Sequence, residues 1–406
     1  MQADGGSARR KICVVVASRA NYARIKTVLS AIKAHDDLEL QVVAAASTLL
    51  ERFGTSVDVM RDDGFEPDAT VRLIVEGENP VTMAKSTGLG LLELPTVFEM
   101  LDPDMVVTVA DRFETIATAI AAAYTNLPVA HTQGGEVSGS IDESVRHAVT
   151  KLAHVHFPAT ELSARRIVAM GEAPESVFTV GCPSIDLAAG TELGLRGAVI
   201  EELNQMGAGA TLDPEAPFVL MMQHPVTTEY GQSFEQINQT LDAVAAIGMQ
   251  ALVFWPNVDA GSEQVAKGIR LFRERGEAEG FHFFRNLPAE TFFRLMAHCA
   301  CMVGNSSAAL REGAWLGTPA VTLGTRQQGR ERGSNVVEVG HDTELIADAM
   351  RDQIEHGPYE PAHLFGDGTA GVKIAEVLAT VQPQIQKRLT YTAKDLGELT
   401  TGSVLA

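Results

Sequence analysis

Short apolar runs alternate with longer stretches of helix-forming residues through the first half of the chain. The runs are rich in β-branched residues and too short for helices, so each predicts a buried strand. These predicted strands are Lys11–Ala17, Leu40–Ala46, Met105–Val109, Pro128–His131, His154–Phe157 and Val177–Val180. Helices are expected between them, over Ala23–Ala34, Phe113–Tyr124, Asp142–Leu152 and Ser163–Met170. Near-continuous apolar strands that alternate with helices indicate a parallel, doubly wound α/β sheet.

The second half of the chain repeats this alternation after a change in composition. Residues 182–216 are rich in Gly, Ala, Asn, Asp and Pro and carry one predicted helix, Gly197–Met206, so they mark a domain boundary. Further strands are predicted at Phe218–Met222, Leu252–Trp255, His282–Phe284, Cys301–Val303, Ala320–Leu323 and Val336–Val339, with helices that include Phe234–Ile247 and Ala260–Glu279.

This pattern predicts two domains, at residues 9–185 and 186–372. A last helix, Val372–Arg388, falls in a segment at 373–390 that we expect to cross back to the first domain. Doubly wound domains bind ligands outside the carboxyl ends of their strands, so the ligand is expected in the crevice between the two sheets.

Composition narrows the class of ligand. The chain has 406 residues, 45% of them apolar, which is enough for two hydrophobic cores. The formal net charge of −20 argues against a nucleic-acid partner or an acidic membrane surface. An anionic small molecule would therefore need a locally positive pocket.

The cysteines and the N-terminus bear on the compartment. Cys13, Cys182, Cys299 and Cys301 show no paired CxxC spacing, so they are interpreted as small buried thiols of a protein from a reducing, cytoplasmic environment. The apolar run that follows Arg9 is too short for a signal peptide, and no stretch reaches the length of a membrane span. No obvious cluster of metal ligands is present, and no cofactor is expected.

The stretch with the clearest chemistry is GNSSAALREGAWLGTPAVTLGTRQQGRERGSNV, residues 304–336. A strand, a Gly/Ser turn and a predicted helix at Ala308–Leu316 would point backbone N–H groups, two hydroxyls and a helix dipole at an anion. Ser306 and Ser307 would hold a phosphate or diphosphate, and Glu312 would accept hydrogen bonds from sugar hydroxyls. Arg326, Arg330 and Arg332 follow on the next loop. Taken alone, the same turn also fits an ordinary helix cap.

Charged residues follow three strands of the first domain. Arg19 comes directly after the first strand, and ADRFE places Asp111, Arg112 and Glu114 after a later one. HTQGGEVSGSIDESVRH follows the next strand and supplies two glycines together with Glu136, Asp142, Glu143, Arg146 and His147. Each set also has a structural interpretation: Arg19 as a surface charge, Asp111 as the start of a helix, and Asp142 with Arg146 as a helix-surface pair. A loop that is this rich in charge favours function.

In the second domain, Gln223-His224-Pro225 ends the first strand on the same side of its sheet. The following proline keeps His224 extended, so its ring could donate to a phosphate. A single histidine is more often structural, which leaves both interpretations open.

Together these motifs resemble the UDP-N-acetylglucosamine 2-epimerase family. SRANY, ADRFE, HTQGGEVSGSIDESVRHAVTKLAH, GCPSID, QHPVTTE and the 304–336 stretch occur in the family's order and spacing, and the resemblance spans about residues 11–380. It is greatest to the hydrolysing branch, which converts UDP-N-acetylglucosamine to free N-acetylmannosamine for sialic-acid synthesis. A sister branch, the alternative, acts on UDP- or GDP-linked 2,4-diacetamido-2,4,6-trideoxy sugars for legionaminic-acid synthesis. The resemblance implies a GT-B fold with two Rossmann-like domains, a UDP- or GDP-linked sugar as ligand, and a homodimer or homotetramer.

The resemblance also implies roles for individual residues. The diphosphate would bind Arg19, His224, Ser306, Ser307 and Arg326, the ribose would bind Glu312, and the base would lie near Arg285 and Asn286. Acid–base work and sugar binding would fall to Asp111, Glu136 and Asp142, with Glu143, Arg112, Gln133 and His224 beside them. Four positions depart from the pattern that the resemblance implies: Asn21 stands in place of Asp, Arg24 in place of Lys, Ala110 in place of Gly, and Gln133 in place of the carboxylate of some relatives. Asn21 and Gln133 touch the acid–base set.

The chemistry of such a reaction fits these residue types. The C2 proton of an N-acetylhexosamine becomes acidic only as the C1–O bond to the diphosphate breaks, so the site must stabilise the leaving group and place a carboxylate at C2. Water then adds to the glycal and gives a free 2-epimeric sugar. Three alternatives remain from the sequence: a non-hydrolysing epimerase, a GT-B glycosyltransferase, and a sugar-nucleotide-binding protein without turnover. The carboxylate-rich loop at 131–147 favours an epimerase over a transferase.

Overall fold

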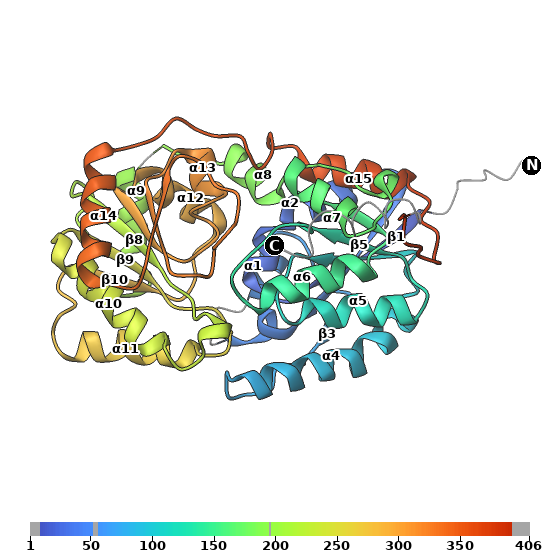
Figure 1. Ribbon diagram of the computed structural model, residues 1–406, viewed down its shortest axis with the longest axis horizontal. Helices are drawn as coiled ribbons and strands as arrows, with labels where there is room; N and C mark the ends of the chain where they lie inside the picture. The colour runs from blue at the N-terminus through green and yellow to red at the C-terminus, as the bar shows by residue number, and fades with distance from the viewer. Residues whose placement is uncertain (1–8, 52–55, 195, 392–406) are drawn as a thin grey trace, which may run out of the picture.

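The computed structural model describes residues 9–51, 56–194 and 196–391, which form two α/β domains side by side (Figure 1). The first domain is built on a six-stranded parallel sheet. Its spatial order is β3 (Ala69–Val71), β2 (Leu38–Ala45), β1 (Arg10–Val16), β4 (Met105–Val109), β5 (Val129–Thr132) and β6 (Val155–Phe157). This is the strand order of a Rossmann sheet, with its switch point between β1 and β4.

The second sheet has seven strands and follows the same plan. Its order is β13 (Val336–Val339), β12 (Ala320–Leu323), β11 (Cys301–Gly304), β8 (Phe218–Met222), β9 (Gln250–Phe254), β10 (Phe281–Phe284) and β7 (Ala208–Gly209). All pairs are parallel except the pairing of β7 with β10. The strand order reverses between β8 and β11, so each domain offers a switch point to the crevice.

Helices cover both faces of the first sheet, as alternate side chains of its strands require. On one face Val14 and its neighbours pack against α2 (Lys26–Ala34) and α15 (Ala370–Thr380). On the other face Val15 and its neighbours pack against α4 (Pro80–Leu101), α5 (Thr115–Tyr124) and α6 (Ile141–Leu152). The long helix α4 was not foreseen from the sequence. A capping box formed by Asn79 and Thr82 starts it, with Pro80 at its first turn.

Helix α15 returns from the second domain to lie on the first (Figure 1). Its first backbone N–H groups, at Ala370 and Gly371, donate to the carboxylate of Asp186 over 2.9 and 2.6 Å. Ile374 and Leu378 are buried in the first domain's core. The predicted helix at Val372–Arg388 was too long, because α15 ends at Thr380, shortly before Pro383, whose ring disfavours helix in the residue before it.

Three other sequence predictions need correction. The region predicted as a turn followed by one helix at Ala23–Ala34 contains two helices. Ser18 caps the short helix α1 (Arg19–Ala23), which ends before α2 begins at Lys26. The strand predicted at Val177–Val180 is a single bridge between Val177 and His156. The helix predicted at Ala308–Leu316 begins only at Glu312, as α13 (Glu312–Leu316), because residues 307–311 form irregular turns.

Two further sequence expectations concern the cysteines and membrane-spanning segments. All four cysteines are buried free thiols. In the described part of the chain, no helix is both long enough and apolar enough to cross a membrane.

The two domains touch along a seam between loops on opposite sides of the crevice. The N–H of Gly139 donates to the carbonyl of Arg326 over 3.1 Å, and the hydroxyl of Thr228 donates to the carbonyl of Gly139 over 3.2 Å. A β-carbon at position 139 would overlap the carbonyl oxygen of Thr325. Glycine is required here by close approach of two backbones.

We predict that Gly139→Ala forces this seam apart. Overpacking should lower the free energy of unfolding by roughly 1–3 kcal/mol, and small-angle X-ray scattering should show a larger radius of gyration. Gly190→Ala is the control, because a β-carbon there meets open space. A Gly139→Ala protein with wild-type melting temperature and scattering would show that the seam does not constrain the domains.

Candidate active site

A cavity of ≈ 430 Å³ lies between the domains, at the carboxyl ends of both sheets. Its walls come from loops that follow β1, β4, β8, β9 and β11, which is where the two switch points face each other. Ten residues singled out from the sequence line it: Arg19, Asp111, Arg112, Asp142, His224, Asn286, Ser306, Ser307, Glu312 and Arg326. The topology therefore brings together most of the predicted set.

Four predicted residues are not among the described residues that line this cavity. Gln133 is buried and donates to the Sγ of Cys182 over 3.0 Å. Glu143 binds the backbone N–H of Ser138 and pairs with residues of its own helix. The side chain of Arg285 lines a neighbouring cavity, and only its carbonyl meets Arg19. Glu136 is 2% exposed and enclosed by arginines, behind the cavity wall.

The turn after β11 depends on its first residue. Gly304 has φ +136°, and a β-carbon there would overlap the carbonyl of Met222 on β8. The chain then presents Ser306 and Ser307 to the cavity. The hydroxyl of Ser307 accepts from Arg24 over 2.7 Å and from Arg311 over 3.2 Å. Positive charge at this turn thus comes from arginine side chains and not from the dipole of a long helix.

His224 is fixed by its neighbours on both sides. Its backbone N–H and carbonyl both bind the side-chain amide of Asn305, over 2.7 and 2.8 Å. The N–H of Asn257 donates to its Nδ1 over 3.3 Å, which leaves the ring proton on Nε2. Burial, and then the charge of Arg326 and other arginines, lowers the pKa of His224 well below its usual value. The ring is a neutral hydrogen-bond donor at the cavity wall.

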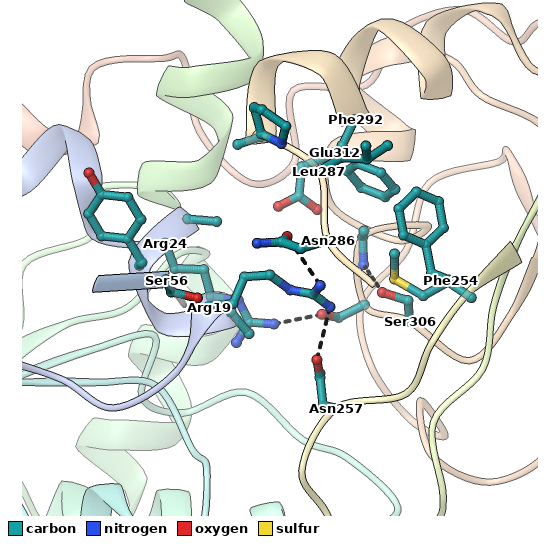
Figure 2. A pocket seen from close by; sticks show the side chains of 18 of the residues that line it. Arg19, Arg24, Ser56, Phe254, Asn257, Asn286, Leu287, Phe292, Ser306 and Glu312 are labelled. Atoms are coloured by element: carbon teal, nitrogen blue, oxygen red, sulfur yellow. Dashed lines mark hydrogen bonds between the residues drawn. The ribbon is translucent and has the colours of Figure 1, made fainter. Parts of the chain in front are cut away.

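Arg19 crosses from the first domain to the second (Figure 2). Its guanidinium donates to the side chains of Asn257 and Asn286, each over 3.1 Å, and to the carbonyl of Arg285 over 2.6 Å. None of these partners carries a negative charge. Burial and the nearby Arg112 lower the pKa of Arg19 to about 10, so it stays charged at neutral pH without a neutralising carboxylate.

Asp111 and Asp142 line the cavity in different electrostatic surroundings. Asp111 binds Arg146 directly, with Arg330 at 3.6 Å and Arg24 at 3.8 Å. Burial alone would raise the pKa of Asp111, but these arginines hold it well below the usual range. Among the described residues Asp142 forms one ion pair, with Arg326 at 3.8 Å. Burial and the charges of Asp111 and Asp259 raise its pKa, and Arg326 and Arg112 only partly offset them. Asp111 therefore stays ionised to a lower pH than an ordinary carboxyl, whereas Asp142 keeps its proton to a higher pH.

Two strands end here in an unusual backbone conformation. Ala110 after β4 and Gln133 after β5 have φ of 58° and 59°, in the left-handed region that non-glycine residues seldom adopt. Glycine, which the resemblance leads us to expect at position 110, adopts this conformation without strain.

The departure at Asn21 also has a structural cause. Its side chain accepts from the N–H of Ala17 over 3.3 Å and donates to the carbonyl of Val109 over 3.2 Å, so it ties β1 to β4. A carboxylate could not make the second bond. Asn21 is fully buried and does not belong with the acid–base groups that face the cavity.

Several site residues were missed in the sequence. Asn257 follows β9 as His224 follows β8, so the same strand-end signal would have found it. Arg311 gave no signal, because it lies in a stretch that predicted a continuous helix. Phe254 and Phe292 form the apolar end of the cavity, with ring centroids 5.4 Å apart in an edge-to-face arrangement. Arg332, by contrast, points away and pairs with Glu338.

The arrangement combines three chemical features in one cavity. Its apolar end suits a flat ring, its middle offers hydroxyls and arginines for an anion, and its far wall carries carboxyls of unequal acidity. Within the described residues, no group of three or more His, Cys, Asp or Glu side chains is placed to hold a metal ion.

Comparison with known proteins finds a matching family. Residues 30–379 match the model of the family described as UDP-N-acetylglucosamine 2-epimerase. The chain is 31% identical over 372 residues to the "UDP-N,N'-diacetylbacillosamine 2-epimerase (hydrolyzing)" of Legionella pneumophila, covering 92% of this chain and 96% of that one. It is 28% identical over 372 residues to the "UDP-N-acetylglucosamine 2-epimerase" of Neisseria meningitidis, covering 91% and 95%.

Solved structures agree on the fold. The structure of the UDP-GlcNAc 2-epimerase from Neisseria meningitidis bound to UDP-GlcNAc matches with a TM-score of 0.72 at 20% identity, over 91% of this chain and 99% of that one. The fold is GT-B, as expected, with two Rossmann-like domains. The family match covers most of the chain, and the chain belongs to the UDP-N-acetylglucosamine 2-epimerase family.

Proposed function

We propose that this protein is a hydrolysing 2-epimerase that converts a nucleoside-diphosphate-linked acetamido sugar into the free 2-epimeric sugar and the nucleotide. The observation that carries the proposal is the shared cavity. The second domain supplies His224, Ser306, Ser307 and Arg326, which with Arg19 of the first domain form an anion-binding wall. The first domain also supplies two carboxyls whose pKa values are shifted in opposite directions. The name of the Legionella relative supports the hydrolysing branch.

The diphosphate would lie against the turn after β11. Ser306 and Ser307 offer hydroxyls, and His224 offers a neutral N–H donor. Arg19 and Arg326 line the same wall and would supply positive charge to the leaving group. Because Arg19 is held by neutral amides, its charge is left for an anionic ligand.

The nucleoside would extend toward the second domain's apolar end. Glu312 is buried at the cavity wall with one carboxylate oxygen that has no partner among the described residues, so it is suited to accept from ribose hydroxyls. Phe254 and Phe292 would enclose the flat base beyond it, together with Leu287. Asn286 would flank the base rather than Arg285, whose side chain turns to the neighbouring cavity.

The sugar would face the carboxyls of the first domain. As the C1–O bond breaks, Asp111 takes the C2 proton, because the arginines around it keep it ionised. The electron pair of the C2–H bond forms the C1–C2 double bond, and the diphosphate leaves with the C1–O electrons. Water then adds its oxygen to C1 and loses one proton to the solvent, while Asp142, whose pKa is raised, delivers a proton to C2 from the opposite face. Exchange with solvent removes the proton that Asp111 took and restores the one that Asp142 gave.

Two features speak against a binding protein without turnover. Asn21 and Gln133, which departed from the usual pattern, both have structural partners and lie outside the cavity wall. The carboxyls that do face the cavity are present. The substrate itself is either the 2-acetamido sugar nucleotide or the 2,4-diacetamido one that appears in the name of the Legionella relative.

Proton NMR in D₂O tests the reaction. We expect the enzyme, given UDP-N-acetylglucosamine and separately the UDP- and GDP-linked 2,4-diacetamido sugars, to release nucleotide and a free 2-epimer deuterated at C2 from one of them. An intact, epimerised sugar nucleotide would instead establish the non-hydrolysing reaction. Binding without any turnover would reject the proposed function.

Replacing Ser306 and Ser307 tests the anion-binding wall. Ser306→Ala with Ser307→Ala removes two hydroxyl donors, and UDP binding measured by calorimetry should weaken roughly 10- to 100-fold. Ser30→Ala, on the exposed side of α2, is the control. Unchanged UDP and GDP affinity in the double variant would remove the diphosphate assignment.

Asp142→Asn tests the proton donor. The variant should bind UDP as the wild type does, while kcat falls on the order of 10²–10⁴-fold. A donor must be protonated, so wild-type kcat should fall as pH rises through the raised pKa of Asp142, and this basic limb should be missing in the residual activity of the variant. Asp36→Asn, at an exposed position, is the matched control. Retention of the basic limb in Asp142→Asn would assign the donor elsewhere.

A further inference from the structure

Behind the cavity wall, two arginines of the second domain reach into the first. Arg311 binds the carboxylate of Glu136, and Arg330 binds the same group over 2.9 Å and lies 3.6 Å from Asp111. Arg311 and Glu136 are 1% and 2% exposed. Neither Arg311 nor Arg330 is among the described residues that line the cavity, so any effect on a bound sugar must pass through other side chains.

From Glu136, further contacts within the first domain lead to the acid–base residue Asp111. The backbone carbonyl of Glu136 accepts from Arg146 over 3.0 Å, and Arg146 binds Asp111 with its other nitrogen. Arg146 is fully buried on α6, the helix whose first turn carries Asp142. The position of Glu136 therefore sets the position of Arg146, and Arg146 sets that of Asp111.

In the other direction the contacts reach the anion wall. The Nη1 of Arg311 donates to the hydroxyl of Ser307 over 3.2 Å, while its Nη2 binds Glu136. One guanidinium thus joins the turn proposed to hold the diphosphate to the loop that precedes the acid–base helix. Its fork geometry fixes both partners at once, which a lysine could not do.

We propose that Arg311 and Arg330 are positioning residues of the reaction, which hold Glu136 across the domain boundary so that the diphosphate turn and the acid–base carboxyls keep a fixed spacing. The inference rests on the proposed function. It assigns Glu136 an indirect role: it is an ionised anchor behind the wall and not the group that exchanges a proton with the sugar.

The surroundings of Glu136 make the proposal sensitive to pH. The groups that face it are Arg146, Arg311 and Arg330, with the thiol of Cys182 nearby. Burial would raise the pKa of Glu136, but the three arginines lower it to about 2. Loss of one arginine must raise this pKa, so Glu136 becomes protonated and loses its ion pairs at a higher pH. The acid limb of kcat should then move upward.

Arg311→Met removes the fork while keeping the length and apolar stem of the side chain. We expect kcat to fall about 10- to 100-fold, as small displacements of reacting groups do, with KM for the nucleotide sugar changed less than about threefold. The acid limb of the pH profile should shift to higher pH. Arg311→Lys should retain more activity than Arg311→Met, and Arg330→Met should resemble Arg311→Met.

Arg332→Met is the matched control, because Arg332, on the loop that also carries Arg330, is exposed and pairs with Glu338 outside the site. Kinetics and an acid limb in Arg311→Met that equal those of Arg332→Met would overturn the proposal. So would a fall in melting temperature alone, since that is what a merely structural ion pair predicts.

A double-mutant cycle with Glu136→Gln tests the route of the effect. If Arg311 acts through Glu136, Arg311→Met should reduce kcat little further in the Glu136→Gln background. Independent, multiplicative losses would overturn the proposal. Should Arg311→Met not fold, Arg311→Lys replaces it in the cycle, and a wild-type kcat and acid limb in that variant would also overturn the proposal. Absence of free sugar from the wild-type enzyme would reject the proposed function itself and is observed separately.

Discussion

The active-site region depends on buried ion pairs whose partners come from different domains. Glu136 and Asp111 of the first domain meet Arg311 and Arg330 of the second, and Arg112 of the first pairs with Asp259 of the second over 3.0 Å. Charges this deeply buried are costly unless they are paired and hydrogen-bonded. The pairs therefore favour the arrangement in which the domains are closed, and that arrangement places the carboxyls opposite the anion wall.

The sheets explain why these groups can meet. Each domain has a switch point, between β1 and β4 and between β8 and β11, where neighbouring crossovers run to opposite faces. Loops that leave the strands there are free of overlying helices and project into the crevice. Gly304 and Gly139 then allow backbones to approach where a β-carbon would collide. Residues far apart in sequence, such as Arg19 and Asn257, reach hydrogen-bonding distance through this geometry.

Much of this could be predicted from the sequence, because apolar strands and the charged residues that follow them are local signals. Arg19, Asp111, His224 and Ser306 each come directly after a strand, and all four line the cavity. The local pattern failed where tertiary contacts decide. Residues 307–311 have good helix formers, yet their turn is shaped by the contacts of Arg311 and Ser307 with the other domain. No periodicity in the sequence predicts that Arg311 is buried against Glu136, which lies 175 residues away.

The same reasoning separates residues that act on the ligand from residues that resemble them in sequence. Glu136 and Asp142 lie six positions apart, Glu136 in the loop after β5 and Asp142 in the first turn of α6, and carry the same functional group, but their surroundings differ. Three arginines keep Glu136 an anion with a pKa of about 2, whereas burial and a neighbouring carboxylate make Asp142 retain its proton to higher pH. An anchor must stay charged and a donor must give up a proton, so the surrounding charges separate Glu136 from Asp142. Asp111 is held ionised by arginines as Glu136 is, but Asp111 lines the cavity and Glu136 does not, so access to the ligand separates those two.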